Sequence, residues 1–162
     1  MTNIRFTGIP TEALAEVLAS GVDHGGNRIE PFIDEVGGSG RPLRCCLSDS
    51  QVGDRIALIA WSPFLWQGPY AELGPIFVHA DPCDGTATDA TLPADLDARA
   101  MVLRPYGHDR KIAYHRVQHV AAGGSLTKEL TALLAEADVD FVHGRNVTGG
   151  CFSFQASTVQ AN

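Results

Sequence analysis

Two short runs of the chain are apolar at almost every position, RIALIAW (residues 55–61) and GPIFVHA (residues 74–80). Successive side chains of a strand point to opposite faces, so an extended run of this composition is apolar on both faces. Such a strand has to be covered on both sides, which is typical of the middle of a sheet. We therefore expect both runs to be buried central strands.

The other strand-like runs follow one another along the chain and are separated by turn residues. Two segments have helical periodicity instead: one opens at Pro10 and Thr11 and stops at Gly21, and the other follows GGS at 123–125 with a leucine stripe. We predict an α+β fold in a single domain over residues 1–162, with a twisted, mostly antiparallel sheet and two covering helices. The remaining expected strands are 3–8, 28–34, 42–47, a hairpin within 99–121, and two strands within 139–157.

The charge of the chain argues against several classes of partner. The formal net charge is −7, and the 12 Lys and Arg residues are scattered singly. Nucleic-acid binders usually carry a basic face, so we expect neither nucleic acid nor a membrane as partner. The sequence shows no apolar run long enough to span a bilayer and no secretory signal, which favours a cytoplasmic location and reduced cysteines.

The run Phe-Val-His occurs twice, each time with a cysteine shortly after it. His79 is followed by Cys83, and His143 is followed by Cys151. If the two strands were neighbours, these four side chains would offer two nitrogen and two sulfur ligands, a set that suits tetrahedral zinc. The spacing matches no compact zinc motif, and the alternative is that each histidine is simply hydrogen-bonded at a strand end.

The segment HGRNVTGGC (residues 143–151) gathers groups that can grip an anion. Arg145 is always charged and forked, Asn146 and the glycine turn add further hydrogen-bond donors, and His143 can transfer a proton. Cys151 near His143 fits the cysteine–histidine arrangement of a nucleophile. The alternative is a polar hairpin turn whose Asn146 and glycines supply a positive φ.

Other residues are weaker candidates. Tyr70 and Tyr106 are secondary candidates for lining the anion site. Cys46 is a second candidate nucleophile, because Arg41 and Arg44 would lower the pKa of its thiol. The sequence shows no phosphate loop or dinucleotide fingerprint, and we expect no cofactor.

Three segments together resemble a family of small bacterial proteins known as domain of unknown function 1203. They are RPLRCCLSDSQVGDRIALIAWSPF, GPYAELGPIFVHADPC and FVHGRNVTGGC. The resemblance covers nearly the whole chain from Arg41 onward, and it implies a compact, stand-alone domain of bacterial, intracellular type. The family usually has a second histidine two residues after the first in the last segment. Arg145 stands there in this chain, which weakens a metal role for His143.

The leading hypothesis is a small-molecule site at one sheet end that binds an anionic ligand. His79, His143, Arg145, Asn146 and Cys151 would line it, and His143 with Cys151 would be the catalytic pair if the protein is an enzyme. Two alternatives stay open: a non-catalytic binding or interaction module that forms a homodimer, and a structural zinc site formed by His79, Cys83, His143 and Cys151.

Overall fold

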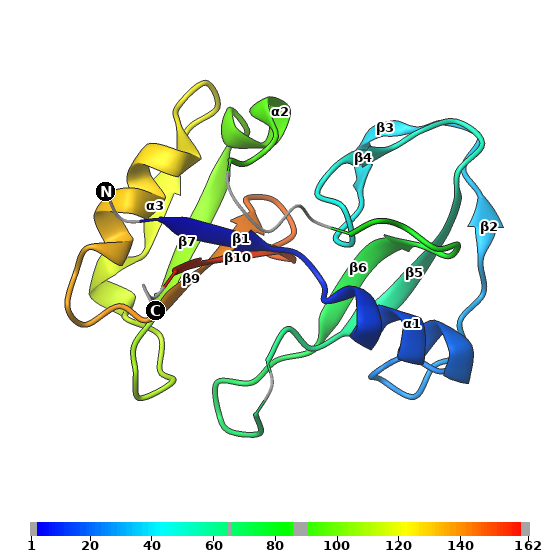
Figure 1. The fold of residues 1–162 in the computed structure, drawn as a ribbon, viewed down its shortest axis with the longest axis horizontal. Helices are drawn as coiled ribbons and strands as arrows, with labels where there is room; N and C mark the ends of the chain where they lie inside the picture. The colour runs from blue at the N-terminus through cyan, green and yellow to red at the C-terminus, as the bar shows by residue number, and fades with distance from the viewer. Residues whose placement is uncertain (1–2, 65, 86–90, 160–162) are drawn as a thin grey trace. The chain divides into compact units, whose positions relative to one another are not determined.

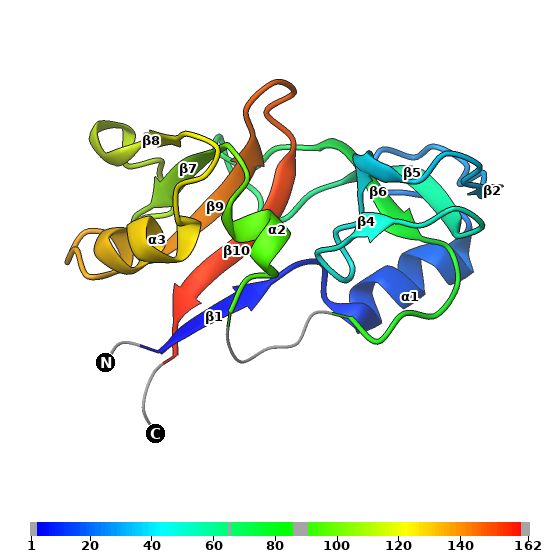
Figure 2. The same cartoon turned by 90° about the horizontal axis from the view of Figure 1, so that it is seen from above.

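The structure is a computed structural model that describes residues 3–64, 66–85 and 91–159. The chain divides into two compact units, residues 1–7 with 87–162 (unit 1) and residues 8–86 (unit 2). Each unit contains antiparallel strands together with helices (Figures 1 and 2). The α+β class predicted from the sequence is confirmed, but the described strands form three sheets where one sheet was expected. That residues 1–162 fold as a single domain stays a prediction.

Unit 1 is built on a five-stranded antiparallel sheet with the order β1-β10-β9-β7-β8. The predicted hairpin across residues 99–121 is confirmed as the pairing of β7 with β8, but a 3-10 helix, Tyr114–Arg116, interrupts the second expected strand. The acidic connection of residues 81–98 contains the short helix α2 (Ala94–Asp97). Residues 86–90 of that connection lie outside the described residues. The strands of this sheet are β1 (Ile4–Thr7), β7 (Met101–Tyr106), β8 (Gln118–Val120), β9 (Phe141–Asn146) and β10 (Phe152–Thr158).

The helix α3 (Leu126–Leu134) covers this sheet and contacts β7, β9 and β10. Ser125 caps its first turn, since the Ser125 hydroxyl accepts a hydrogen bond from the Lys128 backbone N–H at 3.3 Å. Asp97 of α2 accepts from the Thr127 backbone N–H at 2.7 Å. The leucine stripe seen in the sequence faces the core, as predicted: its buried members are Leu126, Leu130, Leu133 and Leu134.

Unit 2 contains a three-stranded antiparallel sheet and a separate two-stranded one. The helix α1 (Thr11–Ser20) packs Leu14 into a core with Ile56, Ile76 and Val78. It ends, as predicted, at Gly21, whose φ of 72° lies in the left-handed region that glycine adopts without strain. The sheets are β2-β5-β6, made of β2 (Phe32–Ile33), β5 (Arg55–Trp61) and β6 (Gly74–His79), and β3-β4, made of β3 (Gly38–Pro42) and β4 (Asp49–Ser50).

The prediction of two central strands is correct for β5 and wrong for β6. β5 lies between β2 and β6, whereas β6 is the last strand of its sheet. The free edge of β6 is covered by the segment that begins at Leu43: Leu43 forms a parallel bridge with Phe77, and the Arg44 N–H donates to the Phe77 carbonyl at 3.0 Å. This cover explains why an edge strand carries the apolar composition of a central one.

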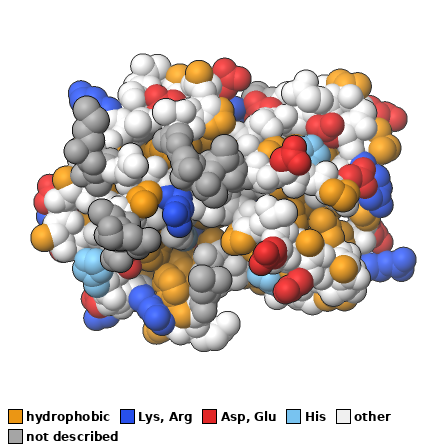
Figure 3. All heavy atoms as spheres, in the orientation of Figure 1, with side chains coloured by type: hydrophobic (Ala, Val, Ile, Leu, Met, Phe, Trp, Pro, Cys, Tyr) orange, Lys and Arg blue, Asp and Glu red, His pale blue; other side chains and the backbone are white. Residues whose placement is uncertain are grey.

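The two Phe-Val-His strands belong to different sheets. β6 belongs to the sheet of unit 2 and β9 to the sheet of unit 1, where it pairs with β10 and β7. Within the described residues, no helix is both long and apolar enough to cross a membrane. On the face drawn in Figure 3, Lys and Arg side chains lie apart from one another among acidic and apolar ones.

Candidate metal centre

A tight turn of residues 43–48 holds two adjacent cysteines. The Leu43 N–H donates to the Ser48 carbonyl at 2.8 Å, and the Leu47 N–H donates to the Leu43 carbonyl at 3.0 Å. Leu47 has a φ of 59°, an uncommon left-handed conformation for a residue other than glycine, asparagine or aspartate. The strand predicted over 42–47 is therefore wrong, because these hydrogen bonds close a turn that places Cys45 and Cys46 at its tip.

The turn is fastened to the end of β6, where His79 lies. The His79 backbone N–H donates to the Cys45 sulfur, with 3.3 Å between the two atoms. Cys45 is buried, while Cys46, His79 and Cys83 are partly buried. All four cysteines of the chain are free thiols. The contact from β6 to the turn brings a histidine and two thiols from distant parts of the sequence to one place.

Four ligand-type side chains meet at this point, namely Cys45, Cys46, His79 and Cys83. Their sulfur and ring nitrogen atoms all lie within 4.8 Å of one another. The His79 Nδ1 atom is 3.4 Å from the Cys45 sulfur and 3.8 Å from the Cys46 sulfur. Cys83 reaches the group from the loop that follows β6. Three sulfurs and one imidazole nitrogen converging in this way form the donor set of a structural zinc site.

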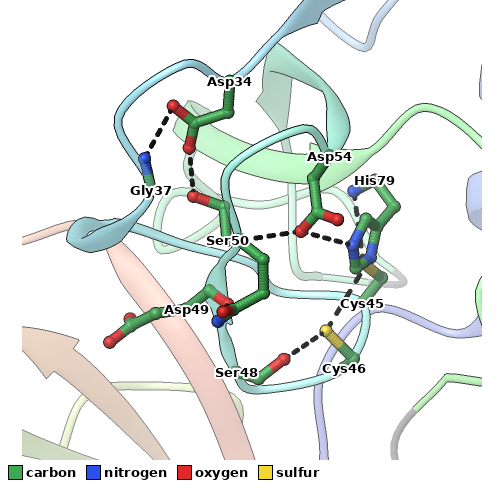
Figure 4. Close-up of polar contacts among 10 residues, drawn as sticks. Asp34, Gly37, Cys45, Cys46, Ser48, Asp49, Ser50, Asp54 and His79 are labelled. Atoms are coloured by element: carbon green, nitrogen blue, oxygen red, sulfur yellow. Dashed lines mark hydrogen bonds and ion pairs between the residues drawn. The ribbon is translucent and has the colours of Figure 1, made fainter.

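Asp54 holds the His79 ring from the other side. The Asp54 Oδ2 atom lies 3.4 Å from His79 Nε2, and Figure 4 shows the ring between this carboxylate and the Cys46 sulfur. Asp54 is itself fixed by the Gln51 N–H, which donates to Oδ2 at 2.7 Å. A carboxylate on one ring nitrogen places the proton there and leaves the other nitrogen, Nδ1, free to act as a ligand.

The adjacent thiols of Cys45 and Cys46 shift each other's pKa in opposite directions. The Cys45 thiol donates to Cys46, and this hydrogen bond, with help from Ser48, lowers the pKa of Cys46 to about 5. The same hydrogen bond and burial raise the pKa of Cys45. The Ser48 hydroxyl lies 2.9 Å from the Cys46 sulfur. The lowered pKa favours the thiolate form of Cys46, and thiolate is the form that binds metal.

A buried carboxylate braces the strands on both sides of the cysteine turn. Asp34 accepts hydrogen bonds from the Val36 and Gly37 N–H groups, both at 3.0 Å, and also from Arg41 and the Ser50 hydroxyl. Figure 4 shows Gly37 and Ser50 reaching its two oxygens. These donors, the Gly37 N–H first and the Ser50 hydroxyl next, hold the pKa of Asp34 at about 2. Arg41 thus forms an ion pair with Asp34, although the sequence suggested it as a cation beside Cys46.

The chain is similar to a known protein family. A family model described as a protein of unknown function, DUF1203, matches residues 40–157. The chain belongs to this family. The matched range includes all four residues of the candidate metal centre. No curated protein and no solved structure matches the chain.

The site residues predicted for this DUF1203 protein are divided between the two units. Of the predicted ligand-binding residues, His79 and Tyr70 belong to unit 2. The others belong to unit 1, and that they line one small-molecule site with His79 stays a prediction. These residues of unit 1 are Tyr106, His143, Arg145, Asn146 and Cys151.

His143 is fully buried in the sheet of unit 1 and surrounded by rings. Its ring centroid lies 4.9 Å from that of Tyr106, 5.2 Å from Phe141 and 4.9 Å from Phe152. Burial, aided by the neighbouring guanidinium of Arg145, lowers the pKa of His143 to about 3. The imidazole is therefore neutral near pH 7 and is a weak base. That it transfers a proton stays a prediction.

The side chains after His143 make local contacts of a hairpin turn. The Arg145 guanidinium is buried, donates to the Gly150 carbonyl at 3.1 Å, and lies 3.4 Å from His143 Nδ1. The Asn146 N–H donates to the Cys151 carbonyl at 3.1 Å. The Cys151 sulfur lies 3.7 Å from the Gly149 carbonyl oxygen. These contacts agree with the alternative interpretation of this segment as a polar hairpin turn. The catalytic roles of His143 and Cys151 stay predictions.

The zinc set considered from the sequence contained two of the four residues that meet. His79 and Cys83 belong to the group, whereas Cys45 and Cys46 complete it in place of His143 and Cys151. The sequence feature that could have pointed to Cys45 and Cys46 is that the two cysteines are adjacent and directly precede a turn-forming segment. Nothing in the linear pattern says that this pair docks on the end of β6.

Proposed function

We propose that the chain is a zinc-binding protein in which Cys45, Cys46, His79 and Cys83 hold one metal ion. The observation that supports this most directly is the convergence of their four ligand atoms within 4.8 Å of one another. Cys₃His sets with no open position are typical of structural zinc, which stabilises a fold by joining segments. Here the ion would join the cysteine turn, the end of β6 and the loop after it.

The spacing of the donor atoms fits a tetrahedral ion. With zinc–sulfur bonds of about 2.3 Å and zinc–nitrogen bonds of about 2.0 Å, a tetrahedron places sulfur and nitrogen about 3.5 Å apart. The His79 nitrogen lies at 3.4 Å and 3.8 Å from the Cys45 and Cys46 sulfurs. Binding therefore requires adjustments of a few tenths of an ångström between these atoms.

The chemistry of the donors selects the kind of metal. Thiolates are soft ligands that favour zinc, copper(I) and iron, and they are poor ligands for magnesium and calcium. The Asp54 carboxylate on His79 Nε2 is the outer partner commonly found on metal-bound histidines, and it makes the ring a better ligand. The Ser48 contact to Cys46 and the His79 N–H to Cys45 stabilise negative charge on two of the sulfurs.

Metal content and titration test this proposal. The reduced protein, purified without chelator, is analysed for zinc, iron and copper, and the chelator-treated protein is titrated with Zn²⁺ and with Co²⁺. We expect about one equivalent of Zn²⁺ per chain and, with Co²⁺, the intense visible bands of a tetrahedral, thiolate-rich site. Cys45→Ser, Cys46→Ser, Cys83→Ser and His79→Gln should each weaken binding.

The fourth cysteine supplies a matched control. Cys151 belongs to unit 1 and is not part of the group, so Cys151→Ser should bind Zn²⁺ as the unchanged protein does. The proposal is wrong if the reduced protein binds less than about 0.2 equivalents of Zn²⁺ and gives no tetrahedral Co²⁺ spectrum. It is also wrong if Cys151→Ser lowers the affinity as much as Cys83→Ser does.

A further inference from the structure

An apolar cavity of about 260 Å³ adjoins the cysteine group in unit 2. Side chains of α1 form one wall, among them Leu14 and Leu18, and Pro82 belongs to another wall. The volume lies just below the roughly 300–1,000 Å³ typical of sites for drug-sized molecules. The cavity therefore has room for a small organic molecule, and its lining favours an apolar one.

Two thiols belong to the lining of this cavity. They are Cys45 and Cys83, whose sulfur atoms also belong to the group within 4.8 Å. Cys83 is partly exposed and Cys45 is buried. A disulfide needs a sulfur–sulfur distance near 2.05 Å, and the two sulfurs lie within 4.8 Å. The loop that carries Cys83 therefore has to move its sulfur by at most about 3 Å to close the bond. A molecule in the cavity thus meets the partly exposed sulfur of Cys83 with the sulfur of Cys45 within 4.8 Å of it.

We propose that Cys83 reduces small apolar hydroperoxides that enter this cavity, and that the reaction ends in a Cys45–Cys83 disulfide. The Cys83 sulfur attacks the terminal oxygen of ROOH, the O–O bond breaks, and Cys83 becomes a sulfenic acid while ROH leaves. The Cys45 sulfur then attacks the Cys83 sulfur, the disulfide forms and water leaves. Two thiols are oxidised by two electrons, and the hydroperoxide is reduced to an alcohol and water.

This activity goes beyond the proposed metal site, since the two steps need no metal. Where zinc is bound, the reaction consumes two of its thiolate ligands, and the ion is released. The apolar wall is the reason to name an organic hydroperoxide instead of hydrogen peroxide. Burying an apolar group about the size of a leucine side chain contributes about 1.5–3 kcal/mol, which corresponds to a preference of about tenfold or more.

The test follows the oxidation of the reduced, chelator-treated full chain by cumene hydroperoxide and by hydrogen peroxide. Intact mass should show the loss of two hydrogens. After trypsin digestion, a cross-link should join the peptide of residues 45–55 to that of residues 56–99. Relative to free cysteine under the same conditions, cumene hydroperoxide should be preferred by about tenfold or more. An equal preference for both oxidants, or a cross-linked product that contains Cys151, would overturn the proposal.

Four variants make the test specific. Cys83→Ser and Cys45→Ser should each abolish the cross-link, and Cys151→Ser should leave it unchanged. Ala15 lines the cavity on the exposed side of α1, so Ala15→Trp should fill the cavity without disturbing the core. It should slow the reaction with cumene hydroperoxide by about tenfold more than it slows the reaction with hydrogen peroxide. An unchanged rate for cumene hydroperoxide in Ala15→Trp would contradict the proposal.

The two proposals can fail separately. If the protein binds Zn²⁺ but forms no Cys83 cross-link, the metal-site proposal holds and the hydroperoxide proposal is wrong. If the protein forms the cross-link but binds no metal, the hydroperoxide proposal holds and the metal-site proposal is wrong. Zinc-loaded protein adds a second readout: treatment with cumene hydroperoxide should release the ion into a zinc indicator, and Cys151→Ser should release it equally.

Discussion

The carboxylate of Asp54 lies 3.4 Å from Nε2 of His79, on the side of the ring opposite to the sulfurs. This contact fixes which nitrogen carries the proton and turns Nδ1 toward Cys45 and Cys46. A ring held in this way loses little rotational freedom on metal binding. The contact therefore contributes to metal affinity although Asp54 is not itself one of the four ligands.

Asp54→Asn should weaken zinc binding by about 10–100-fold, the usual effect of removing an outer partner of a metal-bound histidine. The asparagine keeps the size of the side chain but loses the charge that makes His79 a stronger ligand. Competition titration with a chromophoric chelator measures the change. The exposed Asp95 supplies a control, because Asp95→Asn makes the same change in net charge in unit 1. Equal affinities for the two variants would show that Asp54 does not act through His79.

The buried His143 should make the free energy of unfolding fall at acid pH. Its pKa is about 3 in the folded protein and about 6.5 when unfolded, so between these values the unfolded chain binds more protons. Stability therefore rises with pH through this window and levels off above about pH 6.5. At pH 5 the loss amounts to about 2 kcal/mol relative to pH 7.

Urea unfolding at a series of pH values from 4 to 7.5 measures this dependence. His143→Gln removes the titrating group. The plot of the free energy of unfolding against pH should therefore be flatter over this window, by about the 2 kcal/mol that His143 contributes between pH 5 and pH 7. His115 is exposed, and His115→Gln should keep the slope of the unchanged protein. A His143→Gln curve as steep as that of His115→Gln would contradict the assignment.

Gly144→Ala should destabilise unit 1. Gly144 lies opposite Phe154 in the pairing of β9 with β10, and a Cβ atom added at Gly144 would overlap the Phe154 ring. Overpacking of this kind costs about 1–3 kcal/mol, measured as a lower midpoint of chemical unfolding. Gly40→Ala is the control, because nothing lies within 4 Å of a Cβ at Gly40 and its φ is not positive. A similar cost at both positions would mean that overlap with the Phe154 ring is not responsible.

Asp34→Asn should loosen the segment that carries the cysteine turn. An amide offers only one acceptor oxygen in place of the two that Asp34 uses for Gly37 and Ser50. Hydrogen bonds to a charged group contribute about 1.5–3 kcal/mol each, so amide exchange at Val36 and Gly37 should become faster by about tenfold or more. Exchange in α3 of unit 1 serves as the internal reference. The pKa of Asp34 is about 2, so the contribution of its charge is present above about pH 4 and is lost as pH falls toward 2.

Local patterns in the sequence determined much of the fold. The leucine stripe of α3, the stop at Gly21 and the apolar run of β5 each depend on neighbours within one or two turns of chain, and all three are confirmed. Helical period and strand alternation are local properties, so a single sequence displays them. The α+β class followed from the order of these segments.

The separation into three sheets and the composition of the candidate metal centre were decided by the tertiary structure. GPIFVHA has the composition of a central strand because residues 43–48 cover its edge, and no local pattern distinguishes such a cover from another strand. His79 and Cys83 stand out in the sequence, but Cys45 joins them through a hydrogen bond across more than thirty residues. Contacts of this range depend on how the chain closes on itself, which local periodicity does not encode.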